Sequence, residues 1–340
     1  MACTCSAIDV HAHIVPPDWE DFAQRFGKGA WPRLEHHDSC SATLMTGDKA
    51  FRKMTSQSWD PARRIEDMDR TGISMQVLSP PPIMFCYWAD AAGAAAFARM
   101  QNENTASVVA RHPARFLGMA TLPLQDIGRA LAELRHARET LGLTAIEIGT
   151  CPAGRDLDDP ALLPVFQACR DLDMSIFVHP ASPIAGGERL TQYYFNNIIG
   201  NPIETALAIS KLIAGGVLER YPDLRFCFAH GGGAFFSILG RLNKGWSIRP
   251  ELSDAIPQAP DFYARKMYFD TLTHDPQTLR LIADKGWGER LVLGSDYPFR
   301  LGDGDPLASL RTAGFDESAI AAIGLRNAQR FLGLEITPGV

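Results

Sequence analysis

The chain has 340 residues, of which 46% are hydrophobic and 21% are charged, with a formal net charge of -6. This composition is typical of a globular protein and argues against a disordered or fibrous one. Because acidic residues outnumber basic ones, the chain has no basic excess for phosphate backbones, and we expect no nucleic-acid partner.

Short β-rich runs alternate with segments of helical periodicity along the whole chain. Strands are predicted at residues 7–13, 75–80, 116–122, 144–149, 175–179, 225–230, 267–271 and 291–296. Helices are predicted at residues 62–71, 91–111, 127–141, 160–172, 202–220, 235–246 and 276–285, with extra helix in 307–332. Eight such units indicate an α/β protein with a (β/α)8 TIM barrel. A doubly wound sheet, the alternative, would need a glycine-rich phosphate loop that we do not find.

One long segment, residues 14–58, separates the first predicted strand from its helix. No Pro-, Gly- or Ser-rich linker divides the chain, so we expect a single domain over residues 1–340. Loops longer than about 15 residues in a compact domain are often lids or binding loops. We interpret 14–58 as a loop or lid insertion that contributes to the site; the alternative is that it only covers the barrel mouth.

The compartment is indicated by the cysteines and the N-terminal sequence. The seven cysteines have no paired spacings, which favours a reducing cytoplasm. The chain start has no charged region followed by an apolar stretch, so we expect no secretory signal. No run approaches the roughly 20 apolar residues that span a bilayer, so we also expect no membrane partner.

His11 and His13 form an HxH motif at the end of the first predicted strand. Side chains two residues apart on a strand point to the same face, so both imidazoles should point into the barrel. Two neutral imidazoles in an apolar interior are costly unless something binds them, and zinc or a similar divalent ion suits them. Taken alone, the motif also fits a pair of hydrogen-bonded structural histidines.

Three more candidate side chains lie at the ends of later predicted strands: His179, His230 and Asp296. Catalytic groups of TIM barrels lie at the C-terminal ends of the strands, so all these side chains should meet at one face. The other histidines, His274 among them, fall in helices or loops, and we interpret them as surface residues. The sequence therefore predicts a metal site with a neighbouring histidine.

This constellation resembles the amidohydrolase superfamily, in which an HxH, two later histidines and an aspartate build a metal site. The stretches WDPARRIEDMDRTGI (59–73), HGGGAFFSILGR (230–241) and LGSDYPF (293–299) resemble the aminocarboxymuconate-semialdehyde decarboxylase family most closely. The resemblance implies a carbon–carbon lyase: a metal-dependent, oxygen-independent decarboxylase of a small unsaturated or aromatic acid. The leading candidate substrate is 2-amino-3-carboxymuconate 6-semialdehyde. A hydroxybenzoate-type decarboxylase and a metal-dependent hydrolase of a C–N or lactone bond remain alternatives.

The resemblance also implies the metal site and its chemistry. One Zn2+ ion per chain would be held by His11, His13, His179 and Asp296, with Mn2+ as the alternative ion. His230 would be the base that takes a proton from metal-bound water or orients that water. In the hydrolase alternative, Asp296 is the catalytic general base as well as a ligand.

Substrate-binding residues follow from the same resemblance. Arg52, within GDKAFR, matches the family's substrate-binding arginine, and a guanidinium suits a carboxylate substrate. Arg241 matches an arginine that reaches into the neighbouring subunit's site, which implies a homodimer. Phe85, Tyr193 and Phe299 are expected to form apolar walls.

Three departures from the family pattern lie near the expected mouth of the barrel. Asp48 stands where a lysine is frequent, and Arg300 stands where a proline is common. A tryptophan seen in relatives is replaced near Tyr193 or Tyr194. These departures leave the metal assignment intact and concern only the part of the site that is expected to select the substrate.

Overall fold

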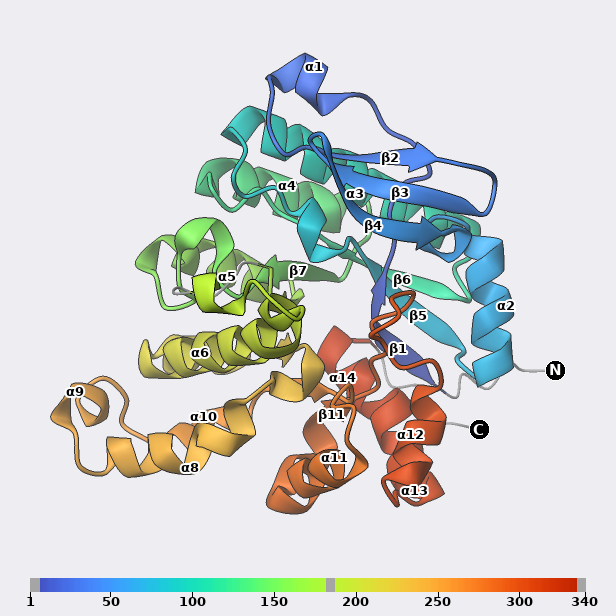
Figure 1. Ribbon diagram of the computed structural model, residues 1–340. Coiled ribbons are helices and arrows are strands. Elements are labelled where there is room, and N and C mark those ends of the chain that lie inside the picture. Colours follow the sequence, from blue (N-terminus) through green and yellow to red (C-terminus); the bar gives the residue numbers. More distant parts are fainter. Residues whose placement is uncertain (1–6, 182–186, 335–340) are drawn as a thin grey trace.

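A computed structural model of the chain describes residues 7–181 and 187–334. Its main sheet has eight strands in the order β1-β5-β6-β7-β8-β9-β10-β11, with helices arranged around it (Figure 1). The strands, each parallel to its neighbours, are β1 Ile8–His13, β5 Met75–Ser79, β6 Phe116–Ala120, β7 Ala145–Gly149, β8 Ser175–His179, β9 Phe226–Phe228, β10 Tyr268–Asp270 and β11 Leu291–Val292.

Backbone hydrogen bonds between β1 and the segment that follows β11 close this sheet. The Val10 amide donates to the Leu293 carbonyl at 2.8 Å, and the Asp296 amide donates to the His11 carbonyl at 2.8 Å. A parallel bridge pairs Ala12 with Tyr297. The predicted (β/α)8 barrel is therefore confirmed, and its closure brings Asp296 next to the HxH strand.

Helices surround the barrel, and local sequence signals mark their ends. The Asp60 carboxylate caps α2 by accepting from the Ala62 amide at 2.9 Å, and Gly72, with φ 73°, ends the helix. The helices are α1 Phe22–Phe26, α2 Pro61–Thr71, α3 Ala91–Arg111, α4 Ile127–Glu139, α5 Leu163–Asp171, α6 Asn201–Ala214, α7 Val217–Arg220, α8 Phe235–Trp246, α9 Pro250–Ser253, α10 Pro260–Ala264, α11 Pro276–Ile282, α12 Pro306–Thr312, α13 Glu317–Ala321 and α14 Asn327–Leu332. No helix in the described ranges is long and apolar enough to cross a membrane.

One predicted helix is divided in the structure. The helix predicted at 202–220 breaks into α6 and α7 because Gly216 adopts a left-handed φ of 67°. The extra helix expected within 307–332 consists of α12, α13 and α14, and Gly314, with φ 76°, follows the first of them. The extra C-terminal helices themselves are present as expected.

The insertion at 14–58 is folded rather than a loop, which corrects our prediction. It contains α1 and an antiparallel sheet of β2 Pro32–His36, β3 Ser41–Thr46 and β4 Lys49–Thr55 (Figure 1). Its aromatic side chains anchor it to α3, because the Phe97 ring lies 4.8 Å from the Phe22 ring and 5.7 Å from the Trp31 ring. The insertion is thus a small sheet held against the barrel by an aromatic cluster.

Candidate metal centre and active site

The four predicted metal ligands converge at the C-terminal ends of the barrel strands. Their ligand atoms, from His11, His13, His179 and Asp296, all lie within 4.8 Å of one another. The three histidines are at most 6% exposed, and the Asp296 side chain is 13% exposed. Asp296 lies in the turn after β11 with a left-handed φ of 58°. The prediction that these four side chains meet is confirmed.

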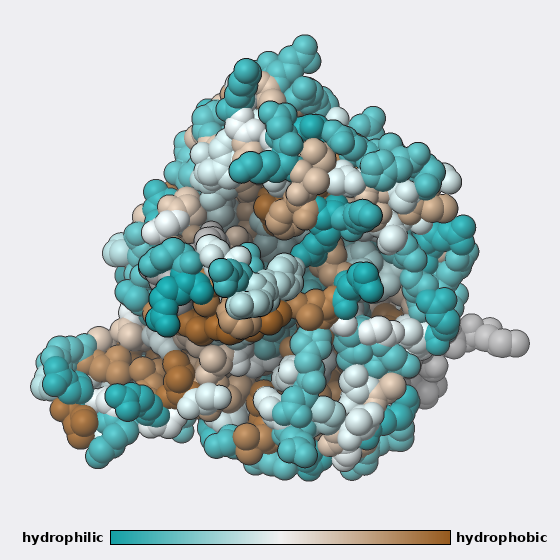
Figure 2. Space-filling view, in the orientation of Figure 1, coloured by the Kyte–Doolittle hydropathy of each residue, from teal (hydrophilic) through white to brown (hydrophobic). Residues whose placement is uncertain are grey.

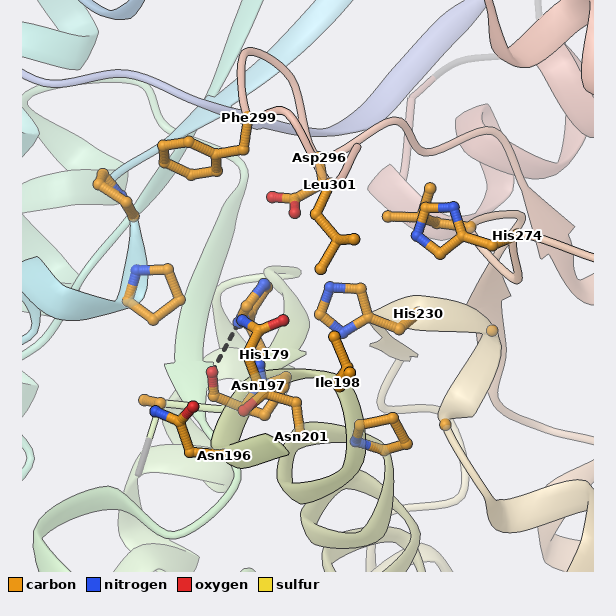
Figure 3. A pocket seen from close by; sticks show the side chains of 18 of the residues that line it. His179, Asn196, Asn197, Ile198, Asn201, His230, His274, Asp296, Phe299 and Leu301 are labelled. Carbon is orange, nitrogen blue, oxygen red and sulfur yellow. Dashed lines mark hydrogen bonds between the residues drawn. The ribbon is translucent and has the colours of Figure 1, made fainter. Parts of the chain in front are cut away.

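The imidazoles turn their Nε2 atoms toward one another because other groups engage two of the Nδ1 atoms. His11 Nδ1 lies 2.7 Å from Asp270 Oδ2, and His179 Nδ1 donates to the Pro180 carbonyl at 2.8 Å (Figure 3). The Nε2 atoms of His11 and His13 are 3.2 Å apart. His179 Nε2 is buried and lacks a hydrogen-bond partner within the described residues. Three such nitrogens and a carboxylate suit a divalent ion such as Zn2+ or Mn2+.

The electrostatics of this cluster also favour a cation. Burial alone would lower the pKa of His11, but the hydrogen bond to Asp270 and the charge of Asp296 raise it to about 9. Burial opposes ionisation of Asp296, yet the hydrogen bond from His13 and the charge of His11 lower its pKa to about 2. Burial lowers the pKa of His179 well below its ordinary value. The carboxylates of Asp270 and Asp296 thus stabilise a positive charge at His11, and they would equally stabilise a metal ion that replaces the proton on His11 Nε2.

His230 lies beside this group without belonging to it. It follows β9 in a short turn, η7 His230–Gly232, with a left-handed φ of 57°. Its ring lies 4.8 Å from the His179 ring and 5.4 Å from the His11 ring. Burial, with a further effect from the charge of His11, lowers the pKa of His230 to about 4. Figure 3 shows His230, His179 and Asp296 pointing into a common space, so a neutral imidazole faces the centre.

This space belongs to a cavity of about 490 Å³ that two predicted substrate-binding residues line, Arg52 and Phe299. The Arg52 guanidinium, on β4 of the insertion, lies 4.3 Å over the Phe299 ring and donates to the Tyr194 hydroxyl at 3.2 Å. The Phe299 ring lies 5.4 Å from the His13 ring. A cation held by an aromatic ring therefore faces the metal centre from the insertion.

Phe85 and Tyr193, which were expected to form apolar walls, are not among the residues that line this cavity. Phe85 is buried with its ring 5.4 Å from the Tyr87 ring, because it packs into the core beside the barrel mouth. Tyr193 is 76% exposed, and its neighbour Tyr194 lines the cavity instead. The two tyrosines are neighbours in an irregular segment, so a difference of one position along the chain decides which ring reaches the cavity.

Arg241 also lies outside the cavity formed by its own chain. It is exposed on α8 and makes no ion pair with the described residues. Asp48 and Arg300 are exposed as well, and neither lines the cavity. Asp48 instead lies 3.9 Å from Arg33, so these two departures from the family pattern do not reach the site.

Sequence reasoning missed several residues that the structure brings to the site. Asp270 was missed although it lies one residue before the end of the strand predicted at 267–271, and it is the last residue of β10. His274, interpreted as a surface residue, is exposed as expected but also lines the cavity, with a left-handed φ of 55°. Asn197 and Asn201 line the cavity below His179 in Figure 3. No motif distinguished these asparagines from ordinary surface amides.

Comparison with known proteins places this fold and site in a family. The amidohydrolase family matches residues 8–334, so the chain belongs to the amidohydrolase superfamily. It is 40% identical over 332 residues to 2-amino-3-carboxymuconate-6-semialdehyde decarboxylase of Dictyostelium discoideum, covering 96% of this chain and 92% of that protein. Within the superfamily, the chain therefore belongs to the aminocarboxymuconate-semialdehyde decarboxylase family.

Solved structures support the same fold. The 5-carboxyvanillate decarboxylase of Sphingomonas paucimobilis superimposes with a TM-score of 0.83 at 23% identity, over 98% of this chain and 100% of that one. The dihydroxybenzoic acid decarboxylase of Polaromonas sp., solved with manganese and 2-nitroresorcinol, gives a TM-score of 0.76 at 21% identity, over 96% and 97%. At these identities the likeness supports the barrel alone.

Proposed function

We propose that the chain is a metal-dependent, oxygen-independent decarboxylase, and that its substrate is 2-amino-3-carboxymuconate 6-semialdehyde. The observation that carries this proposal is one cavity in which a His3Asp centre, the neutral His230 and the Arg52 guanidinium face one another. Identity of 40% to the Dictyostelium decarboxylase supports this substrate over a hydroxybenzoate. In this cavity Arg52 supplies a cation for a substrate carboxylate, and His230 supplies a group that moves a proton.

The ion at the centre is, in this proposal, one zinc per chain held by His11, His13, His179 and Asp296. The manganese of the Polaromonas decarboxylase makes that ion the alternative. When bound, a divalent ion supplies positive charge that polarises substrate oxygens and stabilises negative charge as carbon dioxide leaves. Three neutral imidazoles would leave the full charge of the divalent ion in place, and the Asp296 carboxylate lowers the net charge of ion and ligands by one unit.

The chain's own groups bind the substrate and move the proton. Arg52 binds a substrate carboxylate, and its contact with Phe299 restricts the guanidinium to one orientation. His230 accepts a proton from water in the cavity, which leaves a hydroxide, and gives that proton to the carbon that loses carbon dioxide. A proton from bulk solvent then neutralises the hydroxide, so that one proton is consumed for each carbon dioxide released. The carbon–carbon bond breaks with its electron pair left on that carbon, and the proton completes the product.

The test is carbon dioxide release under argon from this semialdehyde and from a panel of hydroxybenzoates, with metal-stripped protein as control. Metal-dependent release from the semialdehyde is the expected result. Release from a hydroxybenzoate alone would keep the class and replace the substrate. No release from any acid, with about one metal per chain measured, would contradict the decarboxylase and favour the hydrolase alternative.

We also propose that the active form is a homodimer in which Arg241 enters the neighbouring site. Exposed apolar side chains spaced by four residues follow one face of α6 and of the π-helix that precedes it, η6 Asn196–Gly200. They are Ile199, Ile203 and Leu207, which are 36%, 41% and 40% exposed. Ile238 on α8 is 38% exposed, and Arg241 lies one turn further along that helix. Figure 2 shows hydrophobic side chains gathered over α6 and over α8 and α9. Such a surface is typical of an interface.

Mixed dimers test this arrangement. Subunits inactivated by Arg241→Ala are combined with subunits inactivated by His230→Ala. If sites are shared, each mixed dimer holds one site with neither substitution, and partial activity should return. Mixed dimers that are confirmed by mass and remain inactive would contradict a role for Arg241 in the neighbouring site.

Two further inferences concern the chain as a whole. The aromatic contacts between the insertion and α3 support a single domain. The free thiols of Cys86, Cys169 and Cys227 are buried, which supports a cytoplasmic location.

A further inference from the structure

Asp270, the last residue of β10, contacts His11 on the side away from the candidate metal centre. Its Oδ2 atom lies 2.7 Å from His11 Nδ1, and both side chains are fully buried, at 0% exposed. The other ring nitrogen, Nε2, lies 3.2 Å from His13 Nε2. The imidazole is therefore held between a carboxylate and the centre.

The second oxygen of the same carboxylate is used by the backbone. Asp270 Oδ1 accepts from the Gly231 amide at 2.7 Å and from the Leu272 amide at 3.1 Å. Gly231 directly follows His230, so this bond also holds the turn that carries His230. The two backbone donors determine which oxygen remains for His11.

We propose that Asp270 is a positioning residue that keeps the Nδ1 proton on His11 and thereby directs the His11 Nε2 lone pair to the metal. A carboxylate only accepts hydrogen bonds, so Nδ1 must donate, and a neutral imidazole that donates from Nδ1 has a free lone pair on Nε2. The same carboxylate orients the His230 turn. This inference rests on the metal centre of the proposed function and is independent of the substrate.

Asp270→Asn tests the role with little change of shape. An amide has one acceptor oxygen, which the two backbone donors Gly231 and Leu272 would occupy. Its NH2 group would then face His11 Nδ1 and require that nitrogen to accept, so the neutral ring would carry its proton on Nε2. That proton lies where the metal ligand must be.

The experiment measures the zinc dissociation constant by chelator competition at pH 7.5. We expect Asp270→Asn to weaken zinc binding by about 10- to 100-fold, the usual effect of losing such a partner. Asp9→Asn is the matched control, because the buried Asp9 carboxylate accepts from the Ser295 hydroxyl, the Gln76 amide and the backbone amide of the same His11 but contacts no imidazole. Unchanged affinity in Asp270→Asn, or equal weakening in Asp9→Asn, would overturn the proposal.

A second measurement is made on the wild-type protein. In zinc-loaded wild-type protein with 15N-histidine, a slowly exchanging Nδ1–H should be observed for His11, with the metal on Nε2. His11→Gln assigns the signal by its loss. Metal on Nδ1, or no protected Nδ1–H, would contradict the proposal. Neither readout depends on turnover, so failure of the decarboxylation assay and failure of this inference are distinguishable.

Discussion

The metal end of the cavity and its opposite rim are held in different ways. The ligands extend from barrel strands or the turns just after them, and their side chains are 0–13% exposed. The rim is formed by Arg52 on the small sheet of the insertion and by Tyr194, which is 53% exposed. Rigid, buried strand ends suit a site that needs fixed geometry, whereas surface segments tolerate change. We infer that the metal chemistry depends on the barrel and that substrate selection depends on the rim.

One buried side chain connects these two regions. Arg64 on α2 is fully buried and donates to the His13 carbonyl at 2.7 Å and to the Gln57 carbonyl at 2.8 Å. Its guanidinium lies 4.7 Å from the Tyr297 ring, next to Asp296. The end of the insertion is thereby tied to both metal-bearing segments.

The largest effect is expected at the metal end. His179→Ala removes a ligand that the other three cannot replace, so metal affinity should fall by more than about 100-fold and carbon dioxide release should stop. Metal content after dialysis and product release measure the two effects. His274→Ala, at the cavity but outside the ligand group, is the control and should keep its metal. A His179→Ala protein with full metal content would contradict the ligand assignment.

His230→Ala should separate chemistry from metal binding at the same end. Because His230 lies outside the ligand group, the variant should keep about one metal per chain. Loss of the proton-moving group should lower kcat by about 10²- to 10⁴-fold. Metal analysis and steady-state kinetics on one preparation measure the metal content and kcat of the variant. Loss of metal from this variant would instead make His230 a ligand.

At the rim, Arg52→Lys should weaken substrate binding more than chemistry. Lysine keeps the charge but loses the planar pair of donors and the ring contact with Phe299. We expect kcat/KM to fall by about 10- to 100-fold, mainly through KM, with metal content unchanged. Arg33→Lys, on the same small sheet but outside the cavity, should behave like wild type. An equal loss in both variants would indicate damage to the sheet.

The smallest effect is expected from Tyr194→Phe, which removes the hydrogen bond that the Arg52 guanidinium donates to the hydroxyl. A net loss of about 0.5–1.5 kcal/mol corresponds to a change in KM of about 2- to 12-fold. Tyr193→Phe is the matched control, since that ring does not line the cavity. A larger change in Tyr193→Phe than in Tyr194→Phe would restore the original prediction for Tyr193.

The sequence by itself determined the barrel and its metal-binding end. The alternation of strands and helices predicts the fold, and the strand period of two places His11 and His13 on one face. The barrel rule that functional groups lie at the C-terminal strand ends adds His179, His230 and Asp296. Each of these predictions needs only local pattern and a general property of the fold.

Only the tertiary structure decided the partners of those residues and the composition of the rim. His11 and Asp270 are 259 positions apart in the chain, and Arg52 and Tyr194 are 142 apart. The same holds for Phe85, which packs into the core, and for the insertion, which folds as a sheet against α3. No local pattern encodes which distant side chains meet, because packing and chain closure over the whole barrel select those contacts.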